Sequence, residues 1–165
     1  MGIIKKIYQT IEKVQLALGT IFISIFLLTI LLQIGSRMMK IPITWSEDVT
    51  KYSFVWAVFM GASWAVANDQ HFAFTPLRNK LKGRKRIIYN IIICIIVLLF
   101  TVSMARYGIE VTRKFWNYKW PNTPQLKMGY IWLSLPVSGI TMSFYLIVHI
   151  LENLINLKKG GNEND

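Results

Sequence analysis

Three long segments without a charged side chain dominate the sequence: Val14 to Ser36, Ile87 to Ala105 and Met128 to Leu151. A helix needs roughly 20 such residues to cross a hydrocarbon core of about 30 Å, so each segment is long enough to span a bilayer. A membrane barrel would instead need many short segments that alternate apolar and polar residues. The sequence therefore predicts an all-α integral membrane protein.

A fourth span is predicted over residues 47–68, where Lys51 lies close enough to the start of the segment to reach the headgroups. The expected fold is thus a single membrane domain, 1–165, with four transmembrane helices at about 14–36, 47–68, 87–107 and 129–152. These helices are joined by loops at 37–46, 69–86 and 108–128.

The formal net charge of +11 comes from basic residues that flank the predicted spans. They do not gather on one soluble face with interleaved aromatic residues, so nucleic acid is not an expected partner. The densest basic run, Arg78 to Arg86, falls in loop 69–86. Loops rich in Lys and Arg stay in the cytoplasm, which predicts that both termini are cytoplasmic and that loops 37–46 and 108–128 are periplasmic.

Two stretches have the composition of the membrane–water interface. Residues 2–13 place isoleucines on one helical face and lysines on the other, which predicts an amphipathic interfacial helix or a continuation of the first span into water. Residues 110–120 mix aromatic and basic side chains, which predicts a second interfacial helix or an ordinary aromatic belt. The expected anchors in the headgroup layer are Trp116, Trp120, Tyr130, Trp132, Arg84, Lys85 and Arg86.

The second helix is expected to begin near Thr44, because Thr44 and Glu47 have the spacing of a capping box. Glu47 and Asp48 then lie in the first turn, where the helix dipole favours acids, and Glu47 can pair with Lys51. The alternative is that one of the two acids contacts a partner subunit. Small residues spaced by four along the same helix predict close association with another helix: Ala57, Gly61 and Ala65.

The residues that catalysis or ion transport would need are missing from the sequence. No acidic residue lies near the middle of a span, and Pro136 predicts a single kinked helix where transport sites use pairs of broken helices. His71 and His149 are too far from other ligands for a metal site, and the lone Cys94 is expected to pack as a small apolar side chain. No catalytic residue, cofactor or metal is therefore predicted, and the chain is not expected to be an enzyme.

The second span and the segment that follows it carry a recognisable pattern: an aromatic residue before two acids, a later Trp, a Phe-x-Gly-Ala run and a histidine. The residues in this pattern are Trp45, Glu47, Asp48, Tyr52, Trp56, Gly61, Ala62 and His71, and a second group is Thr123, Pro124, Leu126, Pro136 and Gly139. In these positions the chain resembles the small membrane subunit, called Q or DctQ-type, of tripartite ATP-independent periplasmic (TRAP) transporters. It departs from that family after His71, where Phe72 to Thr75 include no Asp.

The resemblance implies a bacterial inner-membrane complex without a cofactor in this subunit. A periplasmic substrate-binding protein (P type) delivers an organic acid of the dicarboxylate or sialic-acid kind, and a large membrane subunit (M type) moves it inward with sodium. The small subunit is then a scaffold beside the large subunit, within the membrane lipids, and helps to dock the binding protein.

We assign expected roles to two groups of residues on this hypothesis. The lateral subunit interface is predicted to involve Trp45, Glu47, Asp48, Tyr52, Trp56, Ala57, Gly61 and Ala65. Docking of the binding protein is predicted to involve Arg37, Lys40, Arg113, Lys114 and Lys119. The alternative function is a self-contained small channel or carrier formed by oligomers of this chain, and a membrane enzyme would need a polar cluster that the sequence lacks.

Overall fold

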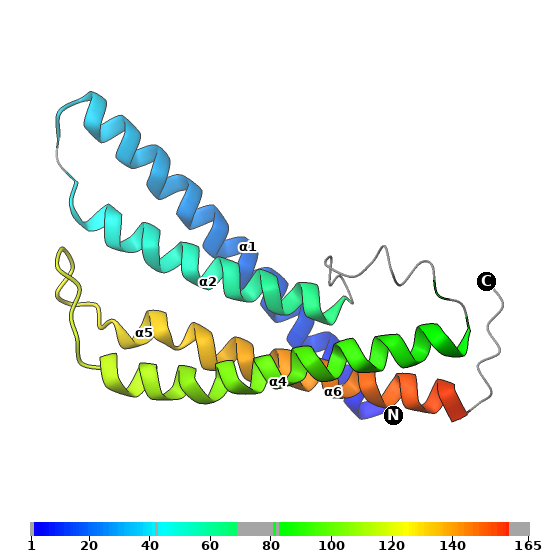
Figure 1. Ribbon diagram of the computed structural model, residues 1–165. Coiled ribbons are helices and arrows are strands. Elements are labelled where there is room, and N and C mark those ends of the chain that lie inside the picture. Colours follow the sequence, from blue (N-terminus) through cyan, green and yellow to red (C-terminus); the bar gives the residue numbers. More distant parts are fainter. Residues whose placement is uncertain (1, 42, 69–80, 82, 159–165) are drawn as a thin grey trace.

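The chain is helical throughout its regular parts in the computed structural model, which describes residues 2–41, 43–68, 81 and 83–158 (Figure 1). The helices are α1 (Gly2–Met38), α2 (Trp45–Ala67), α4 (Arg84–Phe115), α5 (Gly129–Trp132) and α6 (Ser134–Lys158). Within these ranges the β pairing is limited to an isolated antiparallel bridge between Lys119 and Lys127. The prediction of an all-α fold is confirmed.

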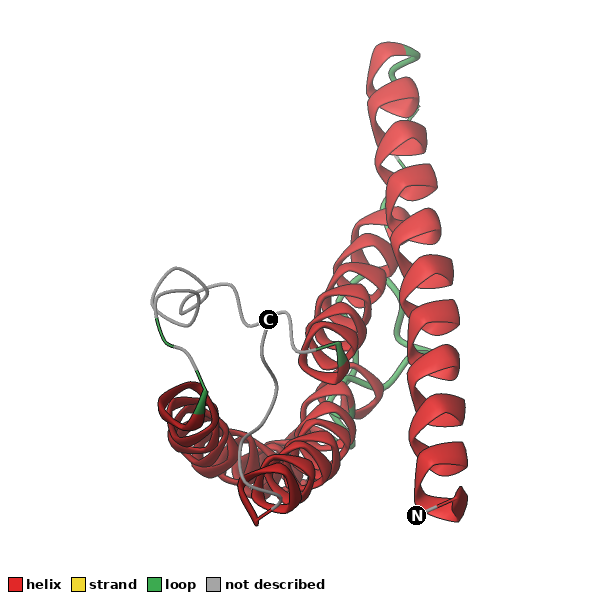
Figure 2. Cartoon of the chain, turned by 90° about the vertical axis from the view of Figure 1, so that its right-hand side faces the viewer, coloured by secondary structure: helices red, strands yellow, loops and turns green. Residues whose placement is uncertain are grey.

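Successive long helices run in opposite directions (Figure 1). One end of the molecule holds the first turns of α1 and α4 and the last turn of α6, and we call it the terminal end. The opposite end holds residues 39–41, 43–44 and 116–128, and we call it the loop end. Helices α1 and α2 pack as one hairpin, α4 and α6 as another, and α2 joins the two by packing on α6. Figure 2 shows that the C-terminal half of α1 extends away from α4 and α6.

Among the described residues, three helical stretches are long and apolar enough to cross a membrane: α1, α4 and the stretch Gly129–Lys158 that contains α5 and α6. Helix α2 has 23 residues, which is sufficient length, but it is not among these three. Its crossing of the bilayer therefore stays a prediction.

The buried residues of α1 are polar, and many of its large apolar residues are exposed. Gln15, Thr29 and Ser36 are its buried residues, and they are separated by multiples of seven positions. On α2, the buried residues Ser46, Ser53, Met60 and Ala67 repeat every seven positions. A seven-residue repeat keeps one seam of each helix facing its neighbour. Because lipid is as apolar as leucine, small and polar side chains belong on that seam and leucines belong outside.

Helices α4 and α6 cross where small residues let their backbones approach. A Cβ atom added to Gly139 would lie 2.7 Å from the Ala105 nitrogen, and one added to Gly108 would lie 2.9 Å from the Leu135 Cβ. The buried core next to this crossing includes Val66, Ala67, Cys94, Met142, Tyr145 and Leu146. Cys94 thus packs inside the core, as expected from the sequence.

The helices extend beyond both ends of the first and third predicted spans. Residues 2–13 form the start of α1, which is continuous over 37 residues, so they are not a separate helix. Whether they lie in the membrane interface or extend into water stays a prediction. At 1.5 Å per residue, α1 is about 55 Å long. Helix α4 runs from Arg84 to Phe115, so it includes Arg84, Lys85 and Arg86 and shortens the expected loop 108–128. Of loop 69–86, residues 69–80 and 82 lie outside the described residues.

The extended α4 also removes the second interfacial helix predicted over 110–120. Residues 110–115 continue α4, because no Gly or Pro within them interrupts the backbone ladder. Residues 116–128 form turns and the short bridge instead. The kink expected near Pro136 is observed as a break at Leu133, between α5 and α6. Proline has no N–H to donate to the carbonyl of Trp132, one turn earlier.

The start of α2 is predicted correctly, but its cap is not. Helix α2 begins at Trp45 after Thr44, whose hydroxyl makes no capping hydrogen bond. Thr44 already has helical backbone angles, φ −77° and ψ −36°, whereas a capping hydroxyl works from an extended residue. The Glu47 carboxylate pairs with Lys51 at 2.7 Å, as expected.

Candidate interaction surfaces

The described residues contain no cluster of three or more His, Cys, Asp or Glu side chains that would hold a metal ion. The polar contacts in these parts of the chain join helices and turns to one another. The candidate functional site therefore comprises the surfaces of α2 and of the loop end.

Asp48 is the most unusual residue of α2, because its carboxylate is only 2% exposed. Its Oδ2 accepts hydrogen bonds from the backbone N–H of Asn122 at 3.1 Å and from the hydroxyl of Thr123 at 2.9 Å. The side-chain amide of Asn122 lies 3.4 Å from Oδ1. Asp48 therefore binds a turn that follows it by more than seventy residues, and it does not cap its own helix.

That turn belongs to a hairpin, residues 118–128, which we call the outer hairpin. Its arms are tied by the N–H of Met128, which donates to the Tyr118 carbonyl at 2.7 Å, and by the bridge between Lys119 and Lys127. The side chains of Lys119 and Lys127 are exposed, whereas Trp120 is 9% exposed. Trp120 thus packs inside the fold, and its role as an anchor in the headgroup layer stays a prediction.

Tyr52 and Trp56 follow Asp48 on the same face of α2 at intervals of four residues, and both contact their own chain. The rings of Trp56 and Phe22 lie 5.5 Å apart, and those of Tyr52 and Phe22 lie 6.4 Å apart. The indole N–H of Trp56 also donates to the Tyr130 carbonyl at 3.0 Å. Three of the residues expected at a subunit interface, Asp48, Tyr52 and Trp56, therefore make internal contacts.

A different face of α2 is open in this chain. We define the open face of α2 by exposed residues that recur every three or four positions: Glu47, Lys51, Phe54, Val58 and Gly61. A Cβ atom added to Gly61 would meet no other atom within 4 Å. Trp45 is exposed as well, while Ala57 is buried and Ala65 is half-buried. An α-helix has 3.6 residues per turn, so residues spaced by four move gradually around the helix. The small-residue stripe therefore lies on the buried side at Ala57 and on the open face at Gly61.

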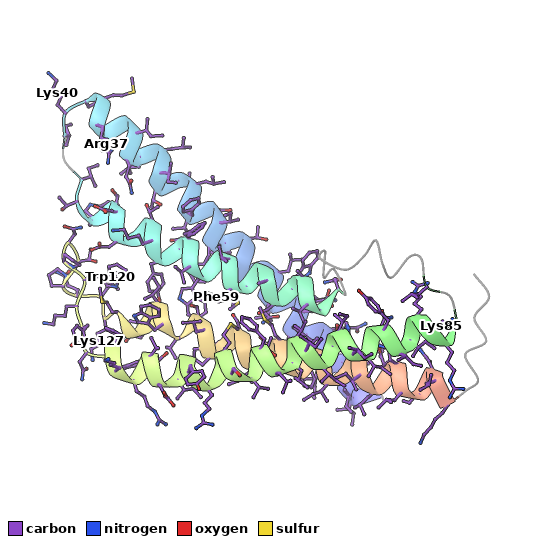
Figure 3. All side chains as sticks on the ribbon, in the orientation of Figure 1. Arg37, Lys40, Phe59, Lys85, Trp120 and Lys127 are labelled. Atoms are coloured by element: carbon purple, nitrogen blue, oxygen red, sulfur yellow. The ribbon has the colours of Figure 1, made fainter. Side chains whose placement is uncertain are left out.

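The five basic residues predicted to dock a binding protein are all exposed and lie at or next to the loop end. Figure 3 shows two of them, Arg37 and Lys40. Arg37 lies in the last turn of α1, and Lys40 has a left-handed backbone, φ 57°, in the turn that follows. Arg113 and Lys114 end α4, and Lys119 lies in the outer hairpin. Among the described residues the one ion pair is Glu47–Lys51, so none of these five charges is neutralised by a carboxylate within this part of the chain.

Aromatic side chains from α4 and α5 gather near the same end. The ring pairs Phe115–Trp132 and Trp116–Tyr130 have centroids 5.7 Å and 5.6 Å apart. Tyr130 is exposed, and Trp116 and Trp132 are half-buried. At the terminal end, Arg84 and Lys85 are exposed and Arg86 is half-buried. A role in the headgroup layer for these residues stays a prediction.

A polar network that the sequence analysis missed lies nearer the terminal end. The hydroxyl of Tyr145, which is fully buried, donates to the Gln15 side-chain oxygen at 2.7 Å, and the Gln15 amide donates to Thr141 at 2.7 Å. Tyr8 donates to the Ala67 carbonyl and lies 2.9 Å from the His149 ring. The available signal was Gln15 itself, an amide in an apolar segment. His71 lies outside the described residues.

Comparison with known proteins places this arrangement in context. Residues 26–156 match the family described as tripartite ATP-independent periplasmic transporters, DctQ component. The chain is 27% identical to the sialic acid TRAP transporter small permease protein SiaQ of Vibrio cholerae, over 96% of this chain and 88% of SiaQ. It is 24% identical to a putative TRAP transporter small permease protein of Haemophilus influenzae, over 70% of this chain and 71% of that protein.

A longer relative is the sialic acid TRAP transporter permease protein SiaT of Haemophilus influenzae. The identity is 28% over 86% of this chain, but the chain spans only 22% of the length of SiaT. The family match covers most of the sequence and agrees with the apolar helices of a multi-pass membrane protein. The chain therefore belongs to the DctQ component family of tripartite ATP-independent periplasmic transporters, whose members are transporter subunits and not enzymes.

Proposed function

We propose that this chain is the scaffold subunit of a TRAP transporter in the bacterial cytoplasmic membrane, where it packs beside a large membrane subunit. The observation that carries this proposal is the open face of α2, on which Gly61 leaves room for a neighbouring backbone. Small residues on a helix surface permit close packing of a second helix in lipid. SiaT supports the idea of a large neighbour, because a segment similar to this chain occupies only 22% of that permease.

The transported substrate is an organic acid, and a sialic acid is the first candidate because two relatives are named for sialic acid transport. A dicarboxylate is the alternative within the same class. Sodium coupling and substrate choice belong to the partners in this proposal. In the described parts of this chain, the middle of each long helix has no acidic side chain that would hold a travelling ion.

The loop end is proposed to face the periplasm and to help dock the substrate-binding protein, with both termini in the cytoplasm. Arg37, Lys40, Arg113, Lys114 and Lys119 are exposed there without a carboxylate partner in the described residues. Such a surface favours an acidic region of a soluble protein, because complementary charge raises the association rate.

The lateral contact is tested by adding bulk to the open face of α2. Gly61→Leu should reduce co-purification with a co-expressed large membrane subunit by about tenfold, because the side chain fills the space the partner needs. Gly35→Leu is the matched control, since a Cβ atom at either glycine meets nothing within 4 Å in this chain. The measurement is the amount of chain recovered with a tagged large subunit in mild detergent.

Wild-type recovery of Gly61→Leu would show that the open face of α2 is not the contact. Failure of the unmodified chain to co-purify in several mild detergents would count against the scaffold role itself.

A further inference from the structure

We propose that Asp48 is a positioning residue that fastens the outer hairpin to α2, so that the docking surface and the open face of α2 move as one unit. The inference rests on the proposed function in one respect, namely that the outer hairpin takes part in docking. The fastening itself follows from contacts within this chain.

Burial of the Asp48 carboxylate costs free energy unless hydrogen-bond donors surround it. A buried acid must have its oxygens satisfied by donors, because removal from water is otherwise strongly unfavourable. The donors that Asp48 receives come from Asn122 and Thr123, at the tip of the outer hairpin. The hydrogen bonds of the Asp48 carboxylate therefore hold the tip of the outer hairpin against α2.

The tip of the outer hairpin has few backbone hydrogen bonds of its own. Pro121 and Pro124 flank Asn122 and Thr123, and proline has no N–H to contribute to a turn. The N–H of Leu126 donates to the Thr123 carbonyl at 3.0 Å, whereas the N–H of Asn122 is donated out of the hairpin to Asp48. Without the Asp48 carboxylate, the Asn122 N–H would need water as its hydrogen-bond acceptor.

The position of Asp48 on α2 connects one side of that helix to the outer hairpin. Asp48 points to the hairpin, and its neighbour Glu47 lies on the open face of α2 and pairs with Lys51. Trp56, two turns along, ties the same side of α2 to Tyr130 at the base of the hairpin. A rotation of α2 would therefore move Lys119 and Lys127 with it. A protein bound to these lysines would in turn change the orientation of the open face of α2.

The test measures hydrogen exchange of residues 118–128 in the purified complex with the large subunit, together with the affinity for the purified substrate-binding protein. Asp48→Ala should raise amide exchange in the outer hairpin by at least about tenfold, because the tip opens more often. The affinity should fall by about tenfold in parallel. Asp48→Asn should have a smaller effect on both, since its amide oxygen can still accept from the Asn122 N–H and the Thr123 hydroxyl.

Glu152→Ala is the control, because it removes an exposed acid of α6 that lies outside both the open face of α2 and the outer hairpin. It should leave hairpin exchange unchanged. Thr123→Val removes one donor from the hairpin side and keeps the test valid if Asp48→Ala does not fold. It should raise hairpin exchange while preserving recovery of the complex.

The outcomes separate this inference from the proposed function. Unchanged exchange in Asp48→Ala and Thr123→Val would overturn the positioning role. Increased exchange with unchanged affinity would confirm the fastening and would instead remove the outer hairpin from the docking surface.

Discussion

Gln15 lies in a segment whose hydropathy is that of a simple membrane anchor, yet it is 3% exposed and both atoms of its amide are used. Its side-chain oxygen accepts from Tyr145, and its nitrogen donates to Thr141. Both partners belong to α6, so one amide connects the first and last long helices. The pattern of charged residues does not predict this contact, because the side chains involved are neutral.

The contribution of this contact is testable by a double-mutant cycle. Gln15→Leu and Tyr145→Phe should each destabilise the chain by about 1 kcal/mol, because each leaves a buried polar group unpaired. The double variant should lose less than the sum, with a coupling of about 0.6 kcal/mol or more. The measurement is unfolding in detergent micelles by a chemical denaturant.

Thr20→Val serves as the control for this cycle, since its exposed hydroxyl bonds only its own helix at the Leu16 carbonyl. It should leave the unfolding midpoint within error. Strictly additive losses for Gln15→Leu and Tyr145→Phe would mean that the two residues do not stabilise each other.

At the same scale, the sequence predicts local pairs better than distant ones. The Glu47–Lys51 pair was predicted from its spacing and is observed at 2.7 Å. The partners of Asp48 were not predicted, because Asn122 and Thr123 come after the end of α4, more than seventy residues later in the chain. A helix repeat relates residues within one or two turns, and it carries no information on which turn a buried carboxylate will bind.

Among the helices, α4 and α6 approach each other closely at Gly139. A Cβ atom at Gly139 would lie 2.7 Å from the Ala105 nitrogen and 2.9 Å from its Cα. Backbone atoms cannot move aside as a flexible side chain can. The separation of these two helices is therefore set by the absence of a side chain at Gly139.

Gly139→Ala should accordingly destabilise the chain by about 1–3 kcal/mol, because the added methyl group forces the helices apart. Gly61→Ala should be neutral or stabilising by about 0.5–1 kcal/mol, since its Cβ meets open space and alanine favours helix. The measurement is the unfolding midpoint of both variants in the same detergent. Equal midpoints for the two variants would contradict the close crossing.

The existence and order of the long helices could be predicted from hydropathy, but their ends could not. Helix α4 continues from the uncharged segment through Glu110 and Arg113 to Phe115, since charged residues are compatible with helix once it has begun. Helix α1 likewise includes Lys5 and Lys6. Hydropathy marks the part of a helix that suits lipid, whereas backbone hydrogen bonds decide where the helix begins and ends.

The whole molecule is two helical hairpins joined through α2 and α6, with the outer half of α1 standing away from the second hairpin (Figure 2). Most of the outward surface of α1 is leucine and isoleucine, including Leu27, Leu28 and Leu31. Such a surface suits lipid or another membrane subunit. The polar contacts of Gln15 lie inside the chain, whereas these apolar side chains of α1 face outward.

The central claim is that this chain supports transport without performing it, and reconstitution into liposomes tests it directly. The measurement is uptake of a labelled sialic acid, driven by a sodium gradient in the presence of the substrate-binding protein. Liposomes that contain this chain alone should show no uptake above empty liposomes, and uptake should appear when the large subunit is added. Uptake by liposomes that contain this chain without the large subunit would contradict the scaffold account and favour a self-contained carrier.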